Sequence, residues 1–122
     1  MITLREEIKN LLEKAIYKAI KDKKLPDFDL SEKAQEDFWR SIIAEHPENK
    51  DLGDYASNVA LRLAKILHKP SMEIAKVIAV EISRVKEVKK YFAKIEAAEP
   101  GFVNFYLSSE YLRKFIAEII KK

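Results

Sequence analysis

Cysteine is absent from this 122-residue chain, and glycine and proline are scarce, with two and four copies. Without cysteine there are no disulfides and no thiolate metal ligands, and a reducing compartment is the natural one. Gly53 and Gly101 are too far apart to form a glycine-rich phosphate loop. No stretch has the roughly 20 apolar residues that cross a bilayer, and no secretory leader pattern is present. We therefore expect a soluble cytoplasmic protein with no membrane partner.

What the chain does contain is an ordinary globular mixture, with 48% hydrophobic and 35% charged residues. This length fits one domain over residues 1–122. The net charge of +3 permits an anionic partner but does not require one.

Candidate catalytic and metal-binding residues are few. His46 and His68 are the only histidines, and neither has a second ligand at a helical offset of three or four residues. The serines fit caps or surface positions, and acidic residues are too common for their pairs to be informative. The sequence predicts no catalytic residue, no metal site and no bound cofactor for this domain.

Apolar periodicity and turn residues agree on most of the layout. They predict helices near 3–25, 54–69, 70–85 and 108–122. The expected helix caps are Thr3, Asp54 and Ser108 or Ser109. The same signals predict a strand over 38–44, a possible short strand within 51–55, and a hairpin over 88–108. The expected fold class is α+β, a small antiparallel β-sheet of three to four strands packed against about four α-helices in two layers. Because the last helix has no glycine or proline terminator, we expect the chain to be a fragment of a longer one.

The lysine run at the end of the first predicted helix comprises Lys21, Lys23 and Lys24. Cations at a helix C-terminus interact favourably with the helix dipole. This interpretation is favoured over a phosphate site.

The predicted hairpin has two distinct faces. With a loop of three residues, Glu99 to Gly101, the side chains of Val103, Phe105 and Leu107 lie opposite Ala97, Ile95 and Ala93 and form an apolar face. The other face gathers Phe92, Lys94, Glu96, Phe102, Asn104 and Tyr106. A two-residue loop would mix apolar and polar residues on both faces, so the odd loop is preferred, although Pro100 would then occupy a position that proline disfavours in a type I turn.

The polar face of the hairpin supports two interpretations. An aromatic ring at Phe102, an amide at Asn104 and ammonium groups at Lys94 and, leading into the hairpin, Lys90 supply stacking, base-edge bonding and phosphate contacts for a single-stranded nucleic acid. Tyr106 lies on the same face. Alternatively, Phe102 packs the hairpin end and the lysines form a solvated edge.

Three segments in this order resemble a known family. They are Gly53-Asp54-Tyr55-Ala56-Ser57-Asn58-Val59-Ala60, Lys69-Pro70 followed by Ile74-Ala75, and Pro100-Gly101-Phe102-Val103-Asn104-Phe105. Together they are similar to the N-terminal additional domain of arginyl-tRNA synthetase. The resemblance is clearest from Asp54 to Leu107 and covers nearly the whole chain.

The resemblance implies that this domain binds a tRNA and that a separate domain carries out catalysis. Such domains bind the D-loop corner of the arginine tRNA, which makes Phe102 the stacking aromatic, Asn104 the polar reader and Glu99 the turn residue beside them. Asp54 and Asn58 are assigned to capping and packing. ATP and arginine belong to a class I catalytic domain of the same chain, whose signature motifs are absent from these 122 residues. No DNA partner is expected.

Two alternatives use the same hairpin face. One is a protein-interaction module whose aromatic residues contact another protein. The other is a stand-alone small RNA-binding protein. Salt dependence separates an RNA interface from an aromatic protein interface, because only phosphate contacts weaken steeply with salt.

Overall fold

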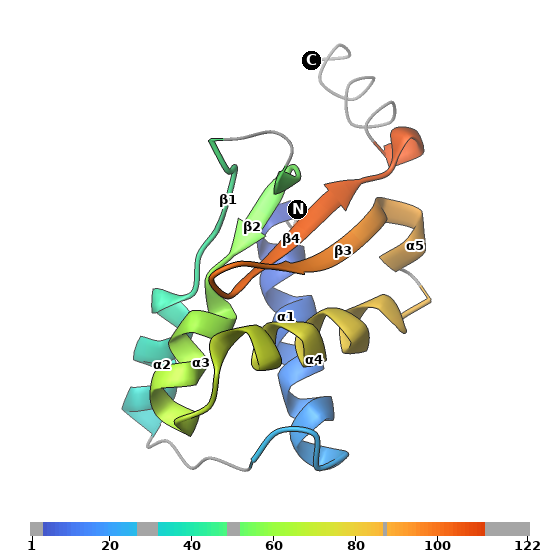
Figure 1. Cartoon of the computed structure of the whole chain (residues 1–122). Helices are drawn as coiled ribbons and strands as arrows, with labels where there is room; N and C mark the ends of the chain where they lie inside the picture. Colours follow the sequence, from blue (N-terminus) through green and yellow to red (C-terminus); the bar gives the residue numbers. More distant parts are fainter. Residues whose placement is uncertain (1–3, 27–31, 49–51, 87, 112–122) are drawn as a thin grey trace.

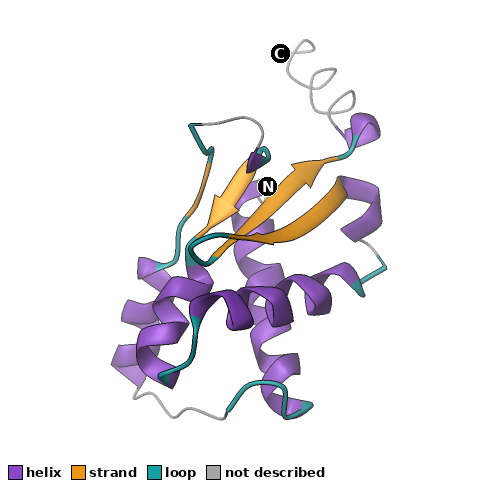
Figure 2. Ribbon diagram, in the orientation of Figure 1, coloured by secondary structure: helices purple, strands orange, loops and turns teal. Residues whose placement is uncertain are grey.

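The computed structural model describes residues 4–26, 32–48, 52–86 and 88–111 (Figure 1). Along the chain the elements are α1 (Leu4–Lys21), α2 (Glu32–Ser41), β1 (Ala44–Glu45), β2 (Tyr55–Ser57), α3 (Val59–Leu67), α4 (Ser71–Ser83), α5 (Val88–Tyr91), β3 (Phe92–Ala98) and β4 (Phe102–Leu107). Figure 2 shows the strands as one layer and the long helices as a second layer beneath them. The predicted α+β class is confirmed.

The four strands form one antiparallel sheet in the order β1-β2-β4-β3. The β3–β4 hairpin has the predicted three-residue loop, because Ala98 pairs with Phe102, Ala97 with Val103 and Ile95 with Phe105. The Gly101 N–H donates to the Ala98 carbonyl at 2.9 Å, which puts Pro100 third in the turn after a cis peptide bond.

One face of this sheet packs on the helices. Val103 and Phe105 of β4 are fully buried there. Helix α4 contacts α1, α3, β3 and β4 and so lies at the centre of the molecule (Figure 1). Isoleucines at four-residue spacing build its inner side, and α1 supplies a matching stripe; the fully buried members are Ile74, Ile78 and Ile82 of α4 and Ile8, Leu12 and Ile16 of α1.

The first arm of the hairpin departs from the prediction at its start. Residues 88–91 form α5 instead of strand, and the pairing is irregular between Phe92 and Lys94. The irregularity shifts Phe92 opposite Leu107, the partner predicted for Ala93, and turns the Phe92 ring inward to 5.3 Å from the Phe105 ring. The assignment of Phe92 to the polar face was therefore wrong, because an extra residue in one strand reverses the alternation before it.

The strand predicted over 38–44 is also wrong. Residues 32–41 form helix α2, and strand β1 starts only at Ala44. Phe38 and Ile42 are both buried at a four-residue separation, which is the spacing of one helical face. Trp39 lies in the helix with its ring 5.0 Å from that of Phe38.

A third correction concerns residues 54–58, which were predicted to start a helix. Tyr55–Ser57 is strand β2, paired on one side with β1 and on the other with β4, and α3 begins only at Val59. Asp54 is therefore not a helix cap. Its carboxylate Oδ2 accepts a hydrogen bond from the Leu107 N–H at 2.8 Å, which ties the start of β2 to the end of β4.

The ends of the chain leave two predictions partly open. Thr3 and residues 112–122 of the last predicted helix lie outside the described residues. At the start of that helix, which the structure does describe, the Ser108 Oγ accepts a hydrogen bond from the Tyr111 N–H at 3.1 Å. This is the contact expected of an N-cap serine. None of the described helices has the length and apolar character that a bilayer crossing requires.

Candidate nucleic-acid interface

A small pocket opens on the outer face of the sheet, beside the hairpin turn. Its volume is about 210 Å³, and we call it the hairpin pocket. Two groups of residues line it, Ala56, Ala98, Glu99, Phe102 and Asn104 from the sheet and turn, and Ile43, Glu45, His46, Pro47 and Leu52 from β1 and the loop after it. Pockets for drug-sized ligands are typically about 300–1,000 Å³, so this one suits a smaller group such as one flat ring system.

The floor of the hairpin pocket lies on a row of paired residues that crosses the sheet, of which Glu45, Ala56 and Asn104 line the pocket and Glu96 does not. Glu45 pairs with Ala56, Ala56 with Asn104, and Asn104 with Glu96, so these four side chains share the outer face. The small Ala56 leaves space between the longer neighbours on either side. The predicted parity of Asn104, away from the core, is confirmed by this register.

Asn104 lies on the outer face but is not exposed to solvent. Its side chain lines the pocket, yet the residue is only 2% exposed. His46, Pro47 and Leu52, which follow β1, line the same pocket, and nothing in the local sequence of β4 indicates that Asn104 is buried there. An amide at the bottom of a pocket meets only a group that enters, and there it can both donate and accept a hydrogen bond.

Apolar side chains form the mouth of the hairpin pocket. Ile43 is 40% exposed and Leu52 is 45% exposed, and both line it. Phe102 is partly buried on the opposite wall. Large apolar side chains left exposed around one hollow favour a ligand with an apolar face.

The wall contributed by β1 and its loop was missed by sequence reasoning. His46 is held there by its ring contact with Tyr55, with centroids 4.4 Å apart, and by donating from Nδ1 to the Asp54 carbonyl at 2.8 Å. Asn58 fixes the neighbouring segment, since its Oδ1 accepts from the Ile43 N–H at 2.9 Å. Asp54 and Asn58 thus make contacts that hold the fold together, but the side-chain capping predicted for them is wrong, since Asp54 does not precede a helix and Asn58 makes no side-chain cap bond.

The remaining predicted site residues are not in the hairpin pocket. Lys94 and Tyr106 pair further along the outer face, with the Lys94 ammonium 4.4 Å from the Tyr106 ring centroid and 3.0 Å from a Glu96 oxygen. The hydrogen bond and the negative charge of Glu96 raise the pKa of Lys94 above its ordinary value. Lys90 lies in α5, at the end of the hairpin opposite to its turn. The structure therefore brings Glu99, Phe102 and Asn104 together and leaves Lys90, Lys94 and Tyr106 apart from them.

The charges around the hairpin pocket are acidic. Glu45 and Glu99 line it, and no lysine or arginine does so among the described residues. Carboxylates repel phosphate groups but accept hydrogen bonds from the amino groups of nucleobases. Such a pocket is suited to a base edge and not to a phosphate. Nowhere in the described part of the chain do three His, Asp or Glu side chains gather as possible metal ligands.

Comparison with known families identifies the class of this fold and pocket. A family model described as the arginyl tRNA synthetase N terminal domain matches residues 4–107. The chain is thus one of the domains that occur in aminoacyl-tRNA synthetases. It belongs to the arginyl-tRNA synthetase N-terminal domain family.

Individual relatives support this assignment. The arginine–tRNA ligase of Bacillus subtilis (strain 168) is 29% identical over 120 residues, which are 98% of this chain and 20% of that protein. That of Acetivibrio thermocellus is 29% identical over 120 residues, 98% of this chain and 19% of the relative. That of Listeria welshimeri is 38% identical over 79 residues, 65% of this chain and 14% of the relative. The chain thus spans about a fifth of the length of the first two relatives.

Proposed function

We propose that this domain binds the arginine tRNA for an arginyl-tRNA synthetase and holds one D-loop base in the hairpin pocket. The observation that carries the proposal is the grouping of Phe102, Asn104 and Glu99 around one small hollow with an apolar mouth. The family of the chain supports tRNA as the ligand, since its relatives are arginine–tRNA ligases.

Each part of the pocket has a role in this proposal. The Phe102 ring stacks on the face of the base, a contact that tolerates any base. Asn104 and the two carboxylates meet the base edge, where donor and acceptor patterns differ between bases. Because the pocket is acidic, the phosphates of the same nucleotide stay outside it.

In this proposal the domain affects the activity of the whole synthetase only by positioning the tRNA. ATP and arginine are bound by a catalytic domain elsewhere in the longer protein. A base held far from the reacting atoms helps to orient the acceptor end of the tRNA, and such remote contacts lower the entropy that the reaction must lose.

The test is binding of the 122-residue chain to the arginine tRNA, followed by fluorescence anisotropy. Phe102→Ala should raise the Kd roughly 5- to 150-fold, which corresponds to about 1–3 kcal/mol for one stacked base. Phe102→Leu keeps the apolar packing and removes the ring, so its loss should be smaller but clear. Tyr17→Leu is the matched control, because Tyr17 is an exposed aromatic on α1 outside the hairpin pocket.

Competition with RNA fragments tests the D-loop itself. A D-arm hairpin of the arginine tRNA should displace the full tRNA, and an anticodon hairpin of equal length should not. Equal competition by both fragments, or a Phe102→Leu variant that binds like the parent chain, would remove the base-reading role from the hairpin pocket.

The protein-interaction alternative rests on the exposed Ile43 and Leu52 at the pocket mouth. It predicts that the chain does not bind the tRNA at any salt concentration. A stand-alone RNA-binding protein predicts the same effect of Phe102→Leu, and the reading frame after Lys122 distinguishes it from a synthetase domain.

A further inference from the structure

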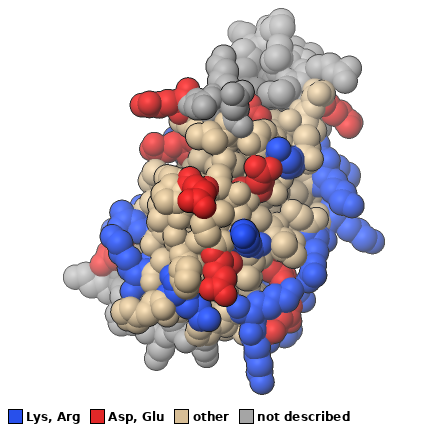
Figure 3. Space-filling view, viewed as in Figure 1, with Lys and Arg blue, Asp and Glu red and all other residues tan. Residues whose placement is uncertain are grey.

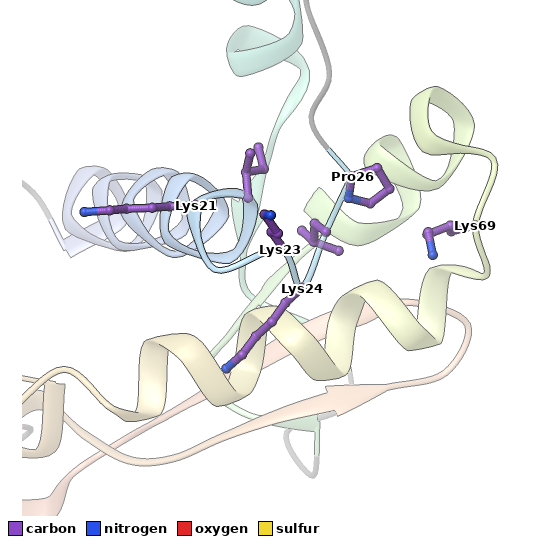
Figure 4. A pocket seen from close by; sticks show the side chains of 7 residues that line it. Lys21, Lys23, Lys24, Pro26 and Lys69 are labelled. Atoms are coloured by element: carbon purple, nitrogen blue, oxygen red, sulfur yellow. The ribbon is translucent and has the colours of Figure 1, made fainter.

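A second and larger hollow lies at the C-terminal end of α1, and we call it the lysine hollow (Figure 4). Its volume is about 430 Å³. Its lining is Ile20, Lys21, Lys23, Lys24, Leu25, Pro26 and Lys69. Four of these seven residues are lysines and none is acidic, so the described lining presents one sign of charge together with the apolar Ile20, Leu25 and Pro26.

One of the four lysines is committed to the fold. The Lys24 ammonium lies 2.6 Å from an Oε1 oxygen of Glu81, whose side chain is only 2% exposed. In Figure 4 the Lys24 side chain accordingly extends toward α4. For Lys21, Lys23 and Lys69 the described residues contain no ion pair. Among the described residues, then, these three lysines have no carboxylate partner that competes with an external anion. Asp27 and Asp29 follow in the sequence but lie outside the described residues.

The backbone at Lys23 is unusual for a lysine. Its φ is 62°, in the left-handed region. The Lys24 N–H donates to the Ala19 carbonyl at 2.8 Å, and the Lys23 N–H to the Ile20 carbonyl at 3.1 Å. These two bonds define a Schellman motif, in which glycine usually occupies the position held here by Lys23. A lysine in this place is a cost to folding that the helix end does not require.

Lys69 comes from a different part of the chain, between α3 and α4. The sequence alone explains Lys21 through the dipole of α1, but the dipole of α1 does not account for a lysine from another element facing the same hollow. Figure 3 shows basic side chains along the lower part of the molecule, where the ends of α1 and α3 lie in Figure 1.

The directions of the side chains indicate what kind of anion fits. In Figure 4 the ammonium groups of Lys21, Lys23 and Lys69 point in different directions and do not converge on one position. A single small anion would contact one of them at a time. An extended chain of phosphates can contact all three in succession.

The lysine hollow is connected to the hairpin pocket through the hairpin turn. The Ser71 Oγ donates to the Pro100 carbonyl at 2.6 Å, and Ser71 follows Lys69 by two residues. Glu99, next to Pro100, lines the hairpin pocket. An RNA strand that leaves the hairpin pocket around this turn therefore reaches Lys69 first.

We propose that Lys21, Lys23 and Lys69 bind the phosphate backbone of the RNA whose base enters the hairpin pocket. This inference rests on the proposed function and adds a second, sequence-independent contact to it. The acidic hairpin pocket reads a base, and the lysine hollow holds the strand.

The experiment measures the Kd of the 122-residue chain for the arginine tRNA between 50 and 200 mM salt. The triple variant Lys21→Gln, Lys23→Gln, Lys69→Gln should lose about 0.7–0.9 per lysine from the slope of log affinity against log salt. Over this salt range the parent chain should then weaken roughly 20- to 40-fold more than the variant. Lys76→Gln is the control, because Lys76 is exposed and lines neither hollow.

Lys23→Gly separates binding from folding. Glycine accepts the left-handed conformation without strain, so this variant should melt a few degrees higher than the parent chain. It should still lose about one phosphate contact from the salt slope. A variant that is more stable and binds more weakly cannot be explained by unfolding.

The outcomes distinguish this inference from the proposed function. If the parent chain binds no tRNA, both are wrong. If Phe102→Leu weakens binding but the triple variant keeps the parental salt slope, only the lysine site is wrong. Inorganic phosphate should compete no better than sodium chloride of equal ionic strength, and specific competition would overturn the extended ligand in favour of a single anion.

Discussion

Asp54 holds two strands of the sheet together with one side chain. Its carboxylate accepts the Leu107 N–H at 2.8 Å, and its own N–H donates to the Phe105 carbonyl at 2.9 Å. The carbonyl of Asp54 in turn accepts from His46, a wall of the hairpin pocket. One residue therefore connects β2 and β4 with His46, which follows β1.

We expect Asp54→Ala to destabilise the fold by about 1–2 kcal/mol, because the Leu107 N–H loses a charged acceptor. Asp54→Asn keeps an oxygen in place and should lose about half as much. Urea unfolding followed by circular dichroism measures both. Equal stability of the alanine variant and the parent chain would show that water replaces the carboxylate at no cost.

Gly53 precedes this aspartate and has a φ of 103°. A Cβ at this position would meet the Phe105 carbonyl oxygen at 2.9 Å, and that oxygen is fixed by its bond to the Asp54 N–H. Gly53→Ala should therefore destabilise the fold by about 1–3 kcal/mol through both strain and contact. A thermal melt measures the loss, with Ala98→Gly at the end of strand β3 as a comparison of the reverse change.

At the scale of the element, alternation and turn chemistry predicted the hairpin well but predicted its surroundings poorly. The register of Ala97 with Val103 followed from polarity alone, since a slip of one residue would have reversed both faces. Helix α2 was mistaken for a strand because Trp39, Ile42 and Ile43 are typical of strands, whereas Phe38 and Ile42 are buried together. The residues after β1 have no pattern that places them at the same pocket as Asn104, because that arrangement depends on pairing between distant segments.

The contact of α4 with the turn after α1 includes one buried charge. Glu81 is 4% exposed in α4, 2.6 Å from the Lys24 ammonium and 3.6 Å from the Arg84 guanidinium. Lys24→Met should destabilise the fold by about 1–3 kcal/mol, because a buried carboxylate loses its closest cation while Arg84 remains.

Replacing both Lys24 and Glu81 by apolar residues tests whether the unpaired carboxylate, and not the loss of the ion pair, causes the destabilisation. The double variant Lys24→Met, Glu81→Leu should be close to the parent chain in urea, because no buried charge is then left unpaired. A double variant that is less stable than the single one would mean that the ion pair itself, and not the unpaired carboxylate, determines the stability of this contact.

At the scale of the whole molecule, the proposed RNA surface separates the signs of charge. The charged residues that line the hairpin pocket are Glu45 and Glu99, and those that line the lysine hollow are all lysines, as far as the structure describes the chain. A net charge of +3 gives little general attraction for RNA. Acidic groups around a reading pocket further weaken contact with any strand whose base does not enter it, and this is a way to gain discrimination at the expense of affinity.

If the acidic groups of the hairpin pocket increase discrimination, removing the carboxylates of Glu45 and Glu99 should reduce it. Glu45→Gln with Glu99→Gln raises the net charge from +3 to +5, since two negative charges are lost. The amides keep hydrogen-bonding groups in the pocket but no longer repel phosphate. The double variant should bind both the arginine tRNA and an unrelated tRNA more tightly, and the unrelated one should gain more, so that the ratio of the two Kd values falls severalfold.

Anisotropy titrations at one fixed salt concentration give this ratio. The control is the double variant Glu13→Gln, Glu110→Gln, which makes the same change of net charge. These two carboxylates line neither the hairpin pocket nor the lysine hollow. If the control pair lowers the ratio as much as the pocket pair, net charge alone sets discrimination. If the pocket pair leaves the ratio unchanged while both affinities rise, the carboxylates oppose RNA in general without taking part in the choice of base. A fall confined to the pocket pair would mean that the charges beside Asn104 act on specificity, since the two variants differ only in where the charge is removed.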